Sequence, residues 1–156
     1  MEKLKLGIEE FAATVGKEDV DFVKEMHDIF TAAGCKLEIK EAKNGYVASY
    51  LHNKKTVANY VFRKKGLLIR IYANHLMAYI PFLDTLPASM AKEIAKAPDC
   101  KRLLNPNDCN PKCAMGYDFI LNGGHYQKCR YNAFFFLISK ESKPFIKEFI
   151  EKELAF

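Results

Sequence analysis

The sequence predicts an α+β fold built on a mostly antiparallel sheet, in a single domain over residues 1–156. Three observations predict it: a helical apolar repeat over residues 17–33, alternating apolar and polar residues from Cys35 to Tyr72, and a second helical repeat over residues 142–154. Runs of strands and runs of helices are segregated, which indicates α+β rather than a doubly wound parallel sheet. We expect the helices to pack chiefly on one face of the sheet.

The first half of the chain reads as one helix followed by a four-strand meander. Apolar residues recur at helical spacing over residues 17–33, and Gly34 suits the end of that helix. Four short strands follow, because residues alternate with period two between tight turns. The expected turns are Asn44-Gly45, His52–Lys55 and Lys64–Gly66.

In the second half of the chain, prolines and a long irregular segment interrupt the expected helices and strands. Pro81 and Pro87 divide residues 75–97 into a short helical piece and a second helix. Residues 98–116 form a long irregular segment with three Pro, three Asn and three Cys, which is unusual inside a compact domain. A hairpin is expected over residues 117–131, followed by a strand over 134–138. That last strand is apolar on both faces, so we expect it at the centre of the sheet, and a final helix covers residues 142–154.

The net charge of +5 comes from the middle of the chain. Residues 63–130 hold 11 Lys or Arg and five Asp or Glu, whereas residues 1–62 have a net charge of −1 and residues 131–156 are neutral. An anionic partner would therefore meet the middle segment. Nucleic-acid binders use Arg for forked phosphate and base contacts, and only four of the 24 basic residues here are Arg, which disfavours nucleic acid as the partner.

Location is expected to be cytoplasmic, without a membrane partner. The N-terminus lacks the apolar region and cleavage site of a signal peptide, and the most apolar stretch, residues 67–83, is interrupted by charged and polar residues. Cysteines are then expected as reduced thiols or metal ligands rather than disulfides.

Four cysteines within 30 residues raise the possibility of structural zinc. Cys100, Cys109, Cys113 and Cys129 would supply four thiolates for a tetrahedral site, which would also hold the irregular segment in place. The spacing lacks the usual pair of cysteines separated by two residues, so the alternative is that all four are free thiols. A catalytic cysteine is a further alternative, with Cys109 or Cys113 as nucleophile and His75 or His125 as base.

The hairpin supplies the candidate ligand-binding residues. One face of its second strand carries His125, Gln127, Cys129 and Tyr131, and the other carries Tyr126, Lys128 and Arg130. Imidazole, amide and phenol groups on one face suit a polar pocket, whereas Lys128 and Arg130 suit recognition of phosphate or carboxylate. The face with Lys128 and Arg130 is expected to be the solvent side.

Aromatic residues interleave with basic residues along the meander, as in platforms that stack single-stranded nucleic acid. The basic residues cluster at turns, and tyrosine and phenylalanine are favoured in any strand, so core and sheet-surface packing is the favoured explanation.

These observations favour a non-catalytic module that binds a small molecule or a protein partner near residues 98–131. His125, Gln127, Tyr131, Arg130 and Lys128 are its expected binding residues. The alternatives are a zinc-stabilised domain with a basic surface for nucleic acid and, third, a cysteine-dependent enzyme.

Overall fold

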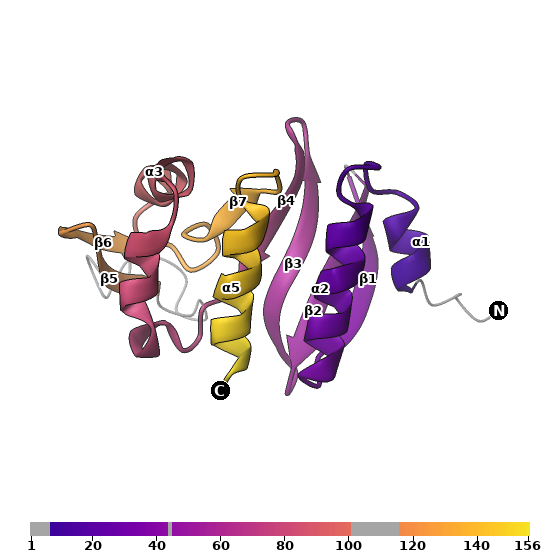
Figure 1. Ribbon diagram of the computed structural model, residues 1–156, viewed down its shortest axis with the longest axis horizontal. Coiled ribbons are helices and arrows are strands. Elements are labelled where there is room, and N and C mark those ends of the chain that lie inside the picture. Colours follow the sequence, from indigo (N-terminus) through magenta and orange to yellow (C-terminus); the bar gives the residue numbers. More distant parts are fainter. Residues whose placement is uncertain (1–6, 44, 101–115) are drawn as a thin grey trace.

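A five-stranded antiparallel sheet forms one layer, and helices cover one of its faces (Figure 1). The computed structural model describes residues 7–43, 45–100 and 116–156. The sheet has the strand order β1-β2-β3-β4-β7. Its strands are β1 (Lys36–Ala42), β2 (Gly45–His52), β3 (Lys55–Arg63), β4 (Gly66–Ile71) and β7 (Phe135–Leu137). The α+β class and the four-strand meander are confirmed.

Tight turns connect the meander because a few residues adopt left-handed backbone angles. Asn53 and Lys54 have φ of 51° and 67°, so β2 and β3 are joined by a two-residue turn whose twist matches that of the strands. Asn122 and Gly123, with φ of 47° and 82°, make the corresponding turn between β5 (Tyr117–Leu121) and β6 (Gly124–Lys128).

The predicted hairpin does not extend the main sheet. β5 and β6 form a separate two-stranded sheet, and the short strand β7 alone joins the meander, beside β4. The expectation of a central position for residues 134–138 is wrong: within the described chain β7 is the last strand in the order, and Leu137 is 38% exposed. Three consecutive Phe residues are accommodated there because Phe134 and Phe136 enter the core, whereas Phe135 points to the other face.

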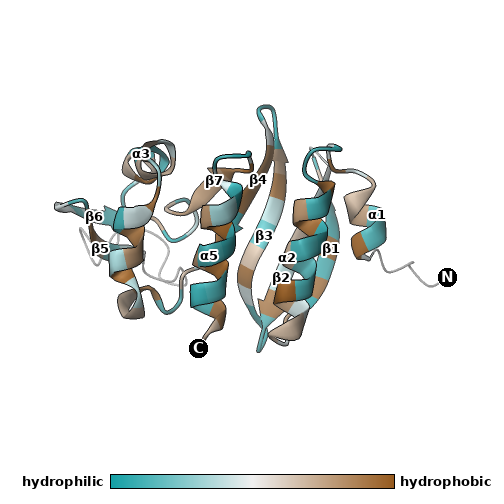
Figure 2. Cartoon of the chain, in the orientation of Figure 1, coloured by the Kyte–Doolittle hydropathy of each residue, from teal (hydrophilic) through white to brown (hydrophobic). Residues whose placement is uncertain are grey.

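The helices that cover the sheet lie on one face of it. They are α1 (Ile8–Ala12), α2 (Val20–Ala32) and α5 (Lys143–Leu154), and hydrophilic residues dominate the outward side of α5 (Figures 1 and 2). Two 3-10 helices, η1 (Leu76–Ala78) and η2 (Ile80–Thr85), lead into α3 (Ala88–Lys96). None of the helices in the described ranges has the length and apolar composition needed to cross a membrane.

The core between helices and sheet is rich in aromatic rings. Tyr50 stacks on Phe30 with 4.0 Å between ring centres, and Phe149 of α5 lies edge-on to Phe134 at 5.0 Å. Tyr60 is fully buried, and its hydroxyl has no hydrogen-bond partner within the described chain. Because these rings occupy the helix side, the polar residues of the same strands are turned to the opposite face. No helix of the described residues lies on that face, and it is called the uncovered face below.

Candidate functional site

One row of side chains crosses all five strands on the uncovered face. Glu38, Ser49, Asn59, Arg70 and Phe135 are successive register partners from β1 to β7. Their chain neighbours on β2, β3, β4 and β7 are core residues, so alternation turns Ser49, Asn59, Arg70 and Phe135 away from the helices. The row therefore places Ser49, Asn59, Arg70 and Phe135 on one face of a sheet whose opposite face is apolar.

Arg70 is the best-held residue of this row. Its Nε donates a hydrogen bond to the Tyr131 carbonyl oxygen at 2.6 Å, and its Nη1 donates to Asn59 Oδ1 at 3.4 Å. The guanidinium carbon lies 4.5 Å from the centre of the Phe135 ring. Two of the five N–H groups are used by these bonds, so the guanidinium is fixed in place while it retains donors for a ligand.

Two further arginines lie against aromatic rings. Arg63 lies 5.9 Å from the centre of the Phe135 ring, and Arg130 lies over Tyr72 and Tyr117 at 5.9 and 5.6 Å. Arg130 also donates a hydrogen bond to Asn74 Oδ1. Within residues 7–43, 45–100 and 116–156 all ion pairs involve Lys or His, so none of the arginines there is paired with a carboxylate of these residues.

The Tyr117 phenol under Arg130 has a structural role. Its oxygen accepts a hydrogen bond from the Ala73 amide at 2.8 Å, which ties the hairpin to the end of β4. Burial raises the pKa of Tyr117 to about 12, so this phenol stays neutral at physiological pH.

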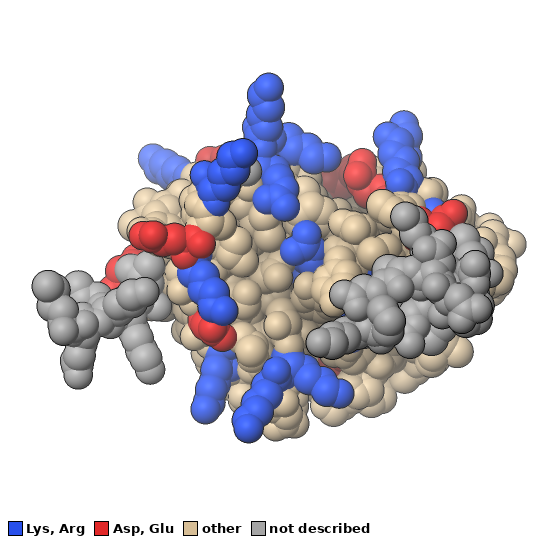
Figure 3. Space-filling model, turned by 180° about the vertical axis from the view of Figure 1, so that it is seen from behind, with Lys and Arg blue, Asp and Glu red and all other residues tan. Residues whose placement is uncertain are grey.

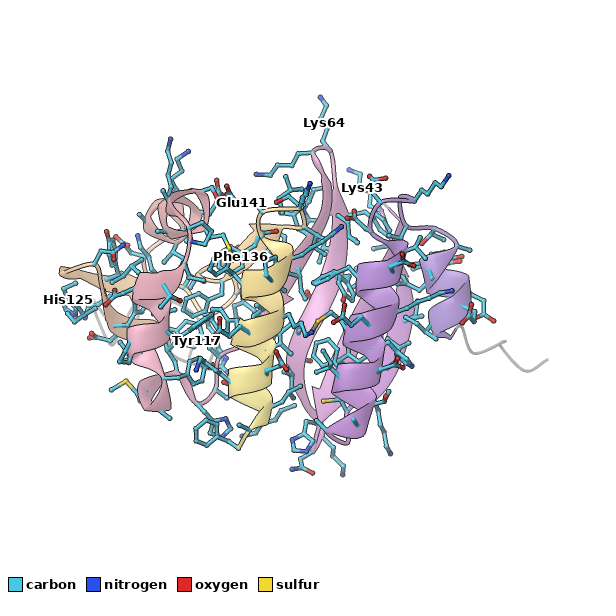
Figure 4. All side chains as sticks on the ribbon, in the orientation of Figure 1. Lys43, Lys64, Tyr117, His125, Phe136 and Glu141 are labelled. Atoms are coloured by element: carbon cyan, nitrogen blue, oxygen red, sulfur yellow. The ribbon has the colours of Figure 1, made fainter. Side chains whose placement is uncertain are left out.

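A cavity of about 260 Å³ opens beside Arg63 and Arg70. Val47 and Val61 form apolar lining, and Lys43 adds a third cation from the turn between β1 and β2. In Figure 4 Lys43 and Lys64 project at the same end of the sheet. The remaining lining residues are Ala42, Gly45, Tyr46 and Phe62. The volume is below that of most drug-sized ligand pockets, which suits a small anionic group.

Positive charge is concentrated on the meander. Residues 36–71 hold nine Lys or Arg and two Glu, a net charge of +7 against +5 for the whole chain. Seen from the side opposite the helices, Lys and Arg side chains lie at the top, the middle and the bottom of this face, and a few Asp and Glu side chains lie toward its left and right sides (Figure 3). Along the sequence, the excess positive charge lies in residues 63–130. The antiparallel pairing of the four strands also brings basic residues that precede residue 63 into the same sheet.

Of the five expected binding residues, Arg130 and Tyr131 lie next to Arg70 and Tyr72. Tyr131 is 43% exposed, and its ring meets Tyr72 edge-on at 5.9 Å. His125 and Gln127 lie elsewhere, on the exposed side of the hairpin, where both donate to Asp118, at 2.6 and 3.1 Å. The hydrogen bond from His125, and after it the one from Gln127, holds the pKa of the Asp118 carboxyl below its ordinary value.

The expectation that Lys128 faces solvent is wrong. Its side chain is 8% exposed, and Nζ donates to the carbonyl oxygens of Ala95 and Ala97 and to Asp99 Oδ1, all within 3.0 Å. A cation is favoured there because the last carbonyl groups of α3 lack helical partners. Lys128 therefore caps a helix, and the exposed side of β6 is the one that carries His125.

Two of the four cysteines expected to bind zinc, Cys100 and Cys129, lie within the described residues. Cys100 and Cys129 both lie alongside β6: Cys100 N donates to the Gln127 carbonyl, and Cys129 N donates to that of Pro98. Both are free thiols, and no group of three metal-ligating side chains occurs within the described ranges. Cys109 and Cys113 lie outside the described residues, as does most of the segment 98–116.

The two histidines considered as bases are both held by carboxylates. His75 Nδ1 is 2.6 Å from Glu153 Oε2, and Tyr79 donates to Glu153 Oε1 at 2.6 Å. Glu153 is buried at the end of α5, and His75 stacks on Phe156, so this cluster fastens the C-terminus to residues 75–79. His125 is paired with Asp118, as described above.

Sequence reasoning included Arg70 only among the basic residues interleaved with aromatic residues along the meander, and it did not single out Asn59 or Phe135 as site residues. Asn59 and Arg70 interrupt otherwise apolar strands at period-two positions, which is a signal for an exposed face. Phe135 gives no such signal within a run of apolar residues. No protein family matches this chain, and neither a curated protein nor a solved structure shows significant similarity to it.

Proposed function

We propose that this protein is a non-catalytic binding module that takes an anionic ligand on the uncovered face of its sheet. The ligand's charged group would occupy the cavity beside Arg63 and Arg70, and Lys43 would neutralise it from the neighbouring turn. This keeps the binding function expected from the sequence but moves the site from the hairpin to the sheet.

The observation that carries the proposal is the convergence of Arg63, Arg70 and Lys43 on one cavity without a carboxylate. Such cations repel one another, and a charge-assisted bond to an anion relieves that repulsion. Arg70 is already fixed by Asn59, Tyr131 and Phe135, so little side-chain entropy is lost when an anion binds.

The composition of the cavity favours binding over catalysis. Its lining supplies positive charge, aromatic edges and apolar surface, and within the described residues it includes no Ser, Cys, His or carboxylate. Those are the groups that most often act as nucleophile or general base.

Titration with inorganic pyrophosphate, followed by the amide resonances of the protein, tests this proposal. We expect the largest shifts at residues 43–47, 61–63 and 70, with a millimolar dissociation constant. Arg63→Gln should weaken binding about tenfold, since one charge-assisted hydrogen bond is lost. Lys24→Gln on α2, across the sheet, is the matched control and should leave the affinity unchanged. Absence of shifts at the cavity, or equal weakening by both variants, would refute the proposal.

A further inference from the structure

We infer that the uncovered sheet face binds single-stranded nucleic acid, a conclusion that rests on the proposed anion site and names its ligand class. Phosphates would contact the Lys and Arg groups, and a base would stack on the surface made by Phe135 and Arg70.

The distribution of charge fits an extended polyanion better than a small anion. Cations lie at both ends of the meander: Lys54 and Lys55 at the turn between β2 and β3, and Lys43, Arg63 and Lys64 at the opposite end. β3 joins the two ends over nine residues, roughly 26 Å at about 3.3 Å per residue. A small anion would need only the cavity, whereas a chain of phosphates would use both ends.

Lys54 places a cation at a backbone position that disfavours lysine. Its φ is 67°, a left-handed angle at which glycine or asparagine is favoured in two-residue turns. A lysine in this position is strained, and it adds to a surface that is already basic. Charge complementarity to a polyanion supplies a reason for it.

Aromatic rings and guanidinium planes supply the stacking surface. Phe135 is partly exposed and lies against Arg70 and Arg63, and Tyr72 lies against Arg130. Bases stack on aromatic rings and on arginine planes with little sequence preference. Three of the four arginines in the chain lie against aromatic rings, and two of them, Arg63 and Arg70, lie against Phe135 on this face, which answers the objection raised by the overall shortage of arginine.

The shape of this face favours single strands over duplex. A sheet presents a flat surface with Ser49 and Asn59 available for base edges, and these edges are accessible only when bases are unpaired. Within the described residues no helix lies on this face to enter a major groove. A membrane surface or an acidic peptide would satisfy the charges but would leave the stacking surface unused.

Fluorescence anisotropy with the full chain and a labelled oligothymidylate of about ten nucleotides tests the inference, at a length typical of one binding site. The logarithm of the affinity should fall with the logarithm of salt concentration with a slope near −3, as expected for about four phosphate contacts. Phe135→Leu should weaken binding about tenfold by loss of one stacked base, with an unchanged slope. Arg63→Gln should reduce the slope by about 0.7.

Phe156→Leu is the matched aromatic control, because Phe156 is also exposed but stacks on His75. It should not change the affinity. Thermal unfolding of each variant checks the fold; if Phe135→Leu is unfolded, Arg70→Lys, which keeps the charge and removes the plane, replaces it with the same expected loss.

The outcomes separate this inference from the proposed function. Pyrophosphate binding at the cavity without oligonucleotide binding would overturn the inference and leave the anion site intact. Oligonucleotide binding that is insensitive to both Phe135→Leu and Arg70→Lys, or that is matched by vesicles with anionic headgroups or by polyglutamate, would also overturn it. Loss of both pyrophosphate and oligonucleotide binding would refute both.

Discussion

Arg70 and Phe135 are register partners across β4 and β7, and the Arg70 guanidinium lies 4.5 Å from the centre of the Phe135 ring. This contact joins the end of the meander to a strand that lies far along the chain. It also fixes, on the uncovered face, the cation around which the proposed site is built.

A double-mutant cycle measures this contact. Arg70→Met and Phe135→Leu each remove one partner, and we expect a coupling free energy of about 0.5–1 kcal/mol in urea unfolding, typical of a cation near an aromatic ring at a partly exposed site. The pair Lys65→Met with Phe135→Leu is the control, and the effects of these two substitutions on the free energy of unfolding should be additive. An additive result for Arg70 and Phe135 would show that the contact does not stabilise the fold.

Two buried tyrosines should respond in opposite directions to loss of the hydroxyl. The Tyr60 hydroxyl is buried without a partner in the described chain, so Tyr60→Phe should raise the free energy of unfolding by about 1 kcal/mol. The Tyr50 hydroxyl lies 2.9 Å from His27 Nδ1, so Tyr50→Phe should lower it by about 1 kcal/mol. Urea unfolding decides this, and destabilisation by Tyr60→Phe would mean that its hydroxyl does have a partner.

Lys128 should matter for stability and not for ligand binding. Lys128→Met removes the charge-assisted bonds to Ala95, Ala97 and Asp99, and we expect a loss of about 2 kcal/mol in the free energy of unfolding. Lys92→Met, an exposed substitution on α3, should have little effect. Reduced pyrophosphate affinity in folded Lys128→Met would contradict the assignment of Lys128 as a helix cap.

The Asp118 carboxyl should titrate below the ordinary range for aspartate. Its pKa is lowered in the folded state by His125 and then Gln127, so this interaction stabilises the fold above the pKa of the unfolded chain and is lost as pH falls through the folded pKa. His125→Ala should raise the pKa of Asp118, and Gln127→Ala should raise it less. NMR titration of the carboxyl carbon measures both, and an unchanged pKa in His125→Ala would exclude the hydrogen bond as the cause.

The zinc alternative stays a prediction and has a direct test. If Cys100, Cys109, Cys113 and Cys129 bind a metal, the protein purified without chelator should contain one zinc per chain, and chelator should lower its unfolding temperature. Native mass spectrometry with elemental analysis measures this. An apo mass with five titratable thiols would exclude zinc. Cys35→Ser is the control and should leave the metal content unchanged, because Cys35 is buried and lies far along the chain from the other four cysteines.

The sequence by itself determined the α+β class, the four-strand meander and its turns. These features depend on local properties: period-two alternation sets which side chains share a face, and residues such as Asn53 and Gly123 tolerate left-handed angles. Helical spacing in residues 17–33 and 142–154 likewise predicted α2 and α5 to within a few residues.

Only the tertiary structure decided which of the chain's polar residues lie together on one face of the sheet. Arg70 and Tyr131 are 61 positions apart, and their hydrogen bond depends on how β7 pairs with β4. Lys128 is buried because the end of α3 docks against it, and Phe135 faces outward because Phe134 and Phe136 fill the core. Pairing and docking between distant segments are set by the packing of the whole core, which local patterns do not encode.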